Sequence, residues 1–71
     1  QDAYILMKTL RNKTLKEARY IDEVIEVKGL LIEKTIVDYN RDEYLKVLTI
    51  KAFKGKEELF ESKELIVLKD Q

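Results

Sequence analysis

Apolar residues are concentrated near the middle of the chain, in residues 24–39, where β-branched and aliphatic side chains predominate. This composition favours an extended strand over a helix, because branched side chains fit a pleated sheet well. Gly29 interrupts the alternation where a β-bulge would insert one residue and keep the apolar positions on one face. These positions are Ile25, Val27, Leu30, Ile32 and Ile36, and Lys34 is the charged exception among them. We predict one long strand with a bulge at Gly29; the alternative is a helix that ends at Lys28 and uses Gly29 as its cap.

Before this stretch, apolar residues recur at the spacing of an amphipathic helix. The residues at i, i+3, i+4 and i+7 are Ala3, Leu6, Met7 and Leu10. Asp2 is a candidate N-cap, and a strand stays open as the alternative for residues 3–10. Asn12 breaks the pattern, and Thr14 and Glu17 have the spacing of a capping box. The sequence therefore predicts two short helices.

Turn-forming residues divide the rest of the chain. Residues 39–43 predict a hairpin loop, residues 54–56 predict a second turn, and residues 44–53 between them predict a returning strand. In this strand one face carries Leu48, Ile50 and Ala52, and the other carries Leu45, Val47 and Phe53. Residues 57–64 fit one helical turn or a charged edge strand, and residues 65–68 predict a short buried strand.

These elements predict one small domain, residues 1–71, of the α+β class and mainly β. A short N-terminal helical segment packs on a twisted three-stranded antiparallel β-meander. A chain of this length needs a dense core, and its 45% hydrophobic residues can supply one.

Two short segments resemble a known family. Residues 18–20, Ala-Arg-Tyr, and residues 24–29, Val-Ile-Glu-Val-Lys-Gly, are similar to the lead-in and first strand of OB-fold domains of the tRNA-anticodon-binding-like type. The resemblance covers residues 2–50 and implies a barrel, here a partial one, because an OB barrel has five strands. It also implies single-stranded nucleic-acid binding on the second and third strands. The matching contact positions are Tyr44, Lys46, Lys51 and Phe53.

Composition argues against most catalytic and metal chemistry. The chain contains no histidine and no cysteine, so the usual zinc ligands, a thiolate and the usual general base are missing. Ser62 has no histidine to activate it. Residues 38–42 open like a calcium loop, but Glu43 stands where glycine is needed and Thr49 where the bidentate glutamate is needed. We therefore expect no enzyme, no catalytic residue, no metal site and no cofactor.

Charge and hydropathy argue against a membrane helix and against nucleic acid, and patches of opposite charge are typical of a plain solvated surface or of protein contacts. Fourteen basic and fourteen acidic residues cancel, which argues against a positive field over the whole molecule. No apolar run reaches the length of a membrane helix. The abundance of Lys, Glu and Ile is typical of proteins of high-temperature organisms, and an AT-rich genome gives the same bias.

The strands carry apolar residues on both faces, and two short helices cannot cover both. We therefore predict a non-enzymatic protein-interaction or assembly module that forms a homo-oligomer or docks a protein partner through its sheet. The alternative is an OB-like single-stranded nucleic-acid-binding domain. The residues expected to mediate self-association are Leu65, Ile66, Val67 and Leu68, on the sheet face or at the free edge of the final strand.

Overall fold

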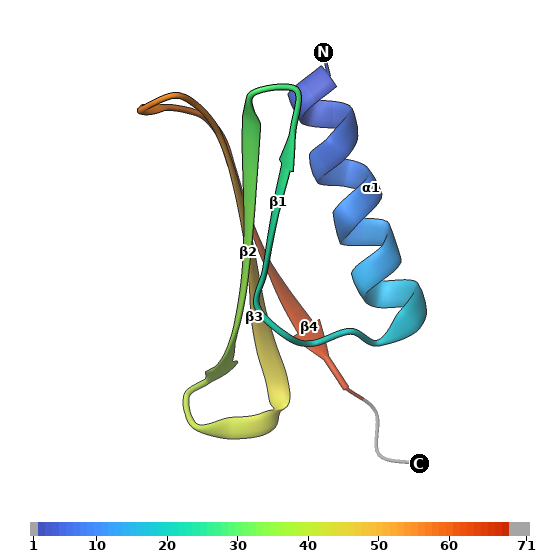
Figure 1. Ribbon diagram of the computed structural model, residues 1–71. Coiled ribbons are helices and arrows are strands. Elements are labelled where there is room, and N and C mark those ends of the chain that lie inside the picture. The colour runs from blue at the N-terminus through green and yellow to red at the C-terminus, as the bar shows by residue number, and fades with distance from the viewer. Residues whose placement is uncertain (1, 69–71) are drawn as a thin grey trace.

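The computed structural model describes residues 2–68 and shows one helix packed on one face of a four-stranded antiparallel sheet (Figure 1). The strands follow one another in the order β1-β2-β3-β4, and the sheet is a twisted meander that does not close into a barrel. The elements are α1 (Asp2–Glu17), β1 (Glu23–Val27), β2 (Leu30–Tyr39), β3 (Asp42–Lys54) and β4 (Glu57–Val67). The α+β class is confirmed, whereas the three-stranded sheet is wrong because the sheet has one strand more.

The N-terminal segment forms one continuous helix of 16 residues, so the prediction of two short helices is wrong. Its buried stripe consists of Ala3, Met7, Leu10 and Thr14. Thr14 does not begin a second helix. Its hydroxyl donates a hydrogen bond to the carbonyl of Leu10 at 2.8 Å, one turn back, which is how a threonine is accommodated inside a helix.

The helix ends in a left-handed cap formed by an alanine. Ala18 has a φ of 53°, and the N–H of Arg19 donates to the carbonyl of Thr14 at 3.0 Å. This bond spans five residues, as in the Schellman motif, in which glycine normally occupies the left-handed position. The cap turns the chain back toward the sheet and leads it into β1.

Residues 28 and 29 form a hairpin turn, so the predicted bulge at Gly29 is wrong. Lys28 and Gly29 have φ angles of 52° and 81°, and both central residues of a type I′ turn require positive φ. Val27 pairs with Leu30 across the turn. The stretch 24–39 is thus two paired strands rather than one long strand. A two-residue turn shifts the alternation by one residue, as a bulge would, which is why the predicted apolar face is nevertheless correct.

The remaining turns lie where the sequence predicts them. Asn40 and Arg41 connect β2 to β3, both with positive φ, and Gly55 helps to connect β3 to β4. Residues 57–64 belong to β4, which settles their ambiguity in favour of the strand. The register between β3 and β4 shifts between Ala52 and Phe53.

The core lies between α1 and the sheet face that α1 covers. Its buried apolar residues are Ala3, Met7, Leu10, Ile32, Leu48, Ile50, Ala52 and Ile66. The helix packs mainly on β2, β3 and β4. Among residues 2–68, no helix is long and apolar enough to cross a membrane.

Candidate functional site

The candidate site is the sheet face that points away from α1, called the open face below. It is built by the residues of each strand that alternate with the core positions. They include Leu31, Glu33, Thr35 and Val37 of β2, Leu45, Val47, Thr49, Lys51 and Phe53 of β3, and Glu61, Lys63, Leu65 and Val67 of β4. No element among residues 2–68 packs over this face.

The end of the open face near the β2–β3 turn is apolar. Val37, Val47 and Leu65 are neighbours across three strands, and Leu45 is paired with Val67. Val37, Leu65 and Val67 are 57%, 51% and 63% exposed. Scattered single apolar residues are ordinary on a protein surface, but a contiguous cluster is typical of a contact surface.

The middle of the open face is polar and carries both signs of charge. Glu33, Lys51 and Glu61 form one row across the three strands. The adjacent row consists of Thr35, Thr49 and Lys63. The six side chains line a shallow depression of about 280 Å³. Such a surface favours a partner whose own charges alternate in sign.

The structure separates the four residues predicted to contact nucleic acid. Lys51 and Phe53 lie on the open face. Tyr44 and Lys46 have the opposite parity in β3, and the ammonium of Lys46 lies 2.5 Å from the carboxylate of Asp38. The four side chains therefore do not form one patch.

The four residues predicted for self-association also divide between the two faces. Leu65 and Val67 lie on the open face and are exposed. Ile66 is buried in the core and Leu68 packs against the core, so neither presents its side chain on the open face. Val37 is not among the residues predicted for self-association, and its place beside Val47 follows from the register of the β2–β3 hairpin.

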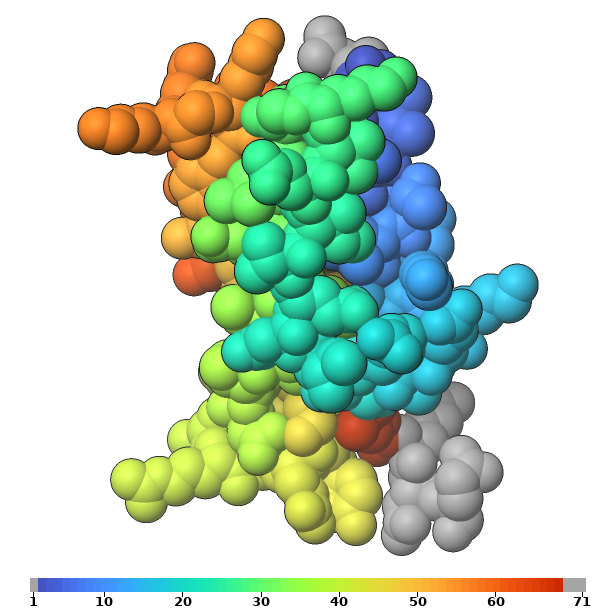
Figure 2. Space-filling model, in the orientation of Figure 1, coloured from blue at the N-terminus to red at the C-terminus, as the bar shows by residue number. Residues whose placement is uncertain are grey.

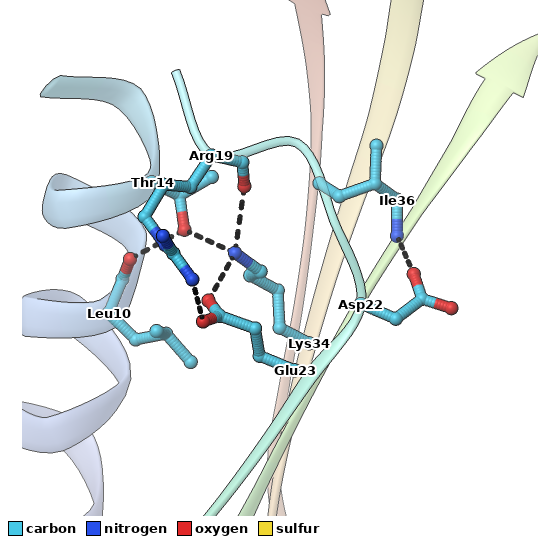
Figure 3. Close-up of polar contacts among 7 residues, drawn as sticks. All are labelled: Leu10, Thr14, Arg19, Asp22, Glu23, Lys34 and Ile36. Atoms are coloured by element: carbon cyan, nitrogen blue, oxygen red, sulfur yellow. Dashed lines mark hydrogen bonds and ion pairs between the residues drawn. The ribbon is translucent and has the colours of Figure 1, made fainter. Parts of the chain in front are cut away.

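A second polar arrangement surrounds Lys34, whose side chain is fully buried under the end of α1 (Figure 3). Its ammonium donates to the hydroxyl of Thr14 at 3.1 Å, the carbonyl of Arg19 at 2.9 Å and the carboxylate of Glu23 at 2.6 Å. An ammonium has three donors, and all three are used. The site therefore ties the end of α1 to β1 and β2 and has no donor left for a ligand.

The same cluster sets the charge of Glu23. Hydrogen bonds from Lys34 and Arg19 lower the pKa of the Glu23 carboxyl to about 2. The Arg19 guanidinium lies 2.8 Å from that carboxylate, and this contact raises the pKa of Arg19. Beside the cluster, the N–H of Ile36 donates to the carboxylate of Asp22 at 2.9 Å. This bond gives the N–H a partner at a point of β2 that lies beyond the end of β1. These contacts explain why a lysine occupies an apolar face.

On its other side, α1 is joined to β4 by an ion pair. Arg11 donates two hydrogen bonds of 2.8 Å to the two carboxylate oxygens of Glu64, which lowers the pKa of Glu64. Nearby, the rings of Tyr4 and Phe60 pack edge to face with centroids 6.1 Å apart. These contacts hold the helix on the sheet, and both charged groups are paired.

No group of three or more potential metal ligands occurs within residues 2–68. Comparison with protein-family models, with curated proteins and with solved structures found no match. The function is therefore inferred from the geometry of the open face.

Proposed function

We propose that the chain is a non-enzymatic assembly module that self-associates through the open face of its sheet. The observation that carries this proposal is the apolar cluster at one end of that face, where Val37, Leu65 and Val67 are each more than half exposed. Covering these side chains with a second apolar surface removes them from water, at about 25 cal/mol per Å².

A second copy of the chain is the partner that the charges favour. A two-fold contact places the same surface on both sides, so that surface must complement itself. The row Glu33, Lys51 and Glu61 carries a positive charge between two negative ones. When the two open faces meet with one copy displaced sideways by one strand, Lys51 of one copy lies opposite a glutamate of the other. The same displacement leaves the apolar cluster of one copy in contact with the apolar cluster of the other.

The proposal is tested by charging the apolar cluster. Leu65→Lys places an ammonium where the contact buries a leucine, so the mass measured by light scattering at micromolar concentration is expected to fall. Tyr44→Lys is the matched control, because Tyr44 is 49% exposed, close to the 51% of Leu65, but has the opposite parity in the sheet. An equal effect of both substitutions, or no effect of Leu65→Lys, contradicts the proposal.

Single-stranded nucleic acid remains the alternative partner for this face and would use Lys51 and Phe53. Its signature is affinity that falls steeply with salt and weakens in Phe53→Ala. The separation of Tyr44 and Lys46 from these two residues is the reason we rank self-association first.

A further inference from the structure

The outer edge of β1 is a second surface without a strand partner. Among residues 2–68 the only strand paired with β1 is β2, so the other side of β1 is a free edge. Figure 2 shows β1 running along the front surface of the molecule. Val24 is 66% exposed and Ile25 is 37% exposed. A free edge with exposed apolar side chains invites pairing with another strand.

The hairpin determines which backbone groups point outward. In a hairpin with a two-residue turn, the residues that flank the turn form a hydrogen-bonded pair, here Val27 and Leu30. Pairing alternates along the strand, so the N–H and C=O groups of Val24 and Glu26 point away from β2. The hydrogen bond from the N–H of Ile36 to the carboxylate of Asp22 supports this assignment. It shows that the backbone N–H groups of the even-numbered residues of β2 point toward the β1 side.

An apolar groove lies beside this edge, between α1 and β1. Two adjoining hollows form it, lined among others by Ile5, Leu6, Ile25 and Val27. Ile5 is 59% exposed although it belongs to the helix that covers the core. A strand added to β1 would place apolar side chains next to Ile25 and beside this groove.

We propose that β1 pairs with β1 of a second copy, antiparallel and centred on Ile25, so that two four-stranded sheets become one continuous sheet. In this register Val24 faces Glu26 of the second copy, and the outward N–H and C=O groups of both residues meet. Glu23 faces Val27, and Ile25 faces itself across the two-fold axis. This contact does not depend on the one proposed for the open face.

Charge selects this register from its neighbours. A possible antiparallel register must bring the outward N–H and C=O groups of the two copies together. It must also keep at least three of the five residues of β1 opposite residues of β1 in the second copy. Three registers meet both conditions, and they are centred on Val24, Ile25 or Glu26. Centring on Val24 sets Glu26 against Asp22, and centring on Glu26 sets that residue against itself, so both oppose like charges. Centring on Ile25 opposes no like charges and places Lys28 opposite Asp22.

The test uses single cysteines, which are informative because the chain has none of its own. Ile25→Cys, Val24→Cys and Glu26→Cys are each made in the Leu65→Lys background, so that the open face does not hold the copies together, and are exposed to a mild oxidant. Residues that directly face each other across a non-hydrogen-bonded pair have Cα atoms about 4.5 Å apart, within disulfide range. Residues offset by two positions lie at or beyond that range.

The expected result is a disulfide-linked dimer of the 8.4 kDa chain from Ile25→Cys and little from the other two variants. Adding Lys28→Asp to Ile25→Cys places two acids opposite each other, so the dimer yield should fall at low salt, and Asp22→Asn should restore it. Equal linkage at all three positions, a maximum at Val24 or Glu26, or no linkage overturns the proposal. The open-face proposal is judged separately, by Leu65→Lys and Tyr44→Lys in chains with an unchanged β1.

Discussion

Replacing Thr14 with valine tests whether the buried Lys34 cluster stabilises the fold. Thr14 is 1% exposed, and its hydroxyl accepts a hydrogen bond from Lys34 while donating one to the carbonyl of Leu10. Valine has nearly the same shape but no hydroxyl. In Thr14→Val the ammonium of Lys34 therefore keeps two of its three acceptors and is left with one unpaired donor in the protein interior.

The expected loss in the free energy of unfolding is about 1–3 kcal/mol, the cost of leaving a buried polar group unpaired. In a domain of this size, each kcal/mol lowers the melting temperature by roughly 4–8 °C. Urea unfolding followed by circular dichroism measures the loss. Thr14→Ser is the control, because it keeps the hydroxyl and removes one methyl group, at a cost of about 0.8 kcal/mol.

A double-mutant cycle with Lys34→Met isolates the contact between the two side chains. Without the ammonium, Thr14→Val leaves no unpaired donor on residue 34, so its effect should shrink by about 1 kcal/mol or more. The reasoning is refuted if Thr14→Val costs the same with and without Lys34, or if Thr14→Ser is as destabilising as Thr14→Val.

Three further predictions concern pH and the left-handed turns. The Glu23 carboxyl has a pKa of about 2 against an ordinary 4.5, so it contributes stability that is complete above pH 4.5 and is lost as the pH falls toward 2. In Glu23→Gln the free energy of unfolding should therefore depend less on pH in that window. Ala18→Gly should stabilise the fold by up to about 1 kcal/mol, because glycine adopts the positive φ of this cap without strain, and an unchanged or lower urea midpoint speaks against the cap. Gly29→Val should lower the unfolding free energy by about 1 kcal/mol or more, because valine is strained at the positive φ that glycine adopts here. An unchanged melting temperature would contradict the left-handed turn.

Much of the sheet could be predicted because alternation of apolar and polar residues reports directly on faces. Leu48, Ile50 and Ala52 share one face as predicted, and that face is the buried one. The same pattern could not distinguish a bulge from a hairpin at Gly29, because a two-residue turn and a bulge both shift the alternation by one residue. The extra strand of the sheet follows from that one turn.

The prediction of two helices is wrong because Thr14 and Glu17 have the spacing of a capping box, and tertiary packing overrides this local signal. Thr14 is buried under the sheet and bonded to Leu10 and Lys34, partners that local spacing does not specify. Lys34 itself was visible as an anomaly, since it is the charged residue on an apolar face. Its partner Glu23 lies directly opposite in the hairpin, so the pair could be found only once the turn was known.

The exposed apolar residues of the open face were predicted in part for a similar reason. The apolar run predicts Leu65 and Val67 together with Ile66, whose side chain points into the core. Strand parity separates these residues once β4 is known to begin at Glu57. The place of Val37 beside Leu65 depends on pairing across three strands, which only the register provides.

The central claim, that the chain assembles with copies of itself through its sheet, is tested most directly by its mass in solution. Light scattering over a hundredfold dilution series from micromolar concentrations should give a mass of at least twice 8.4 kDa that decreases on dilution. A constant mass of 8.4 kDa over the whole series, with no binding of an apolar dye, would contradict it.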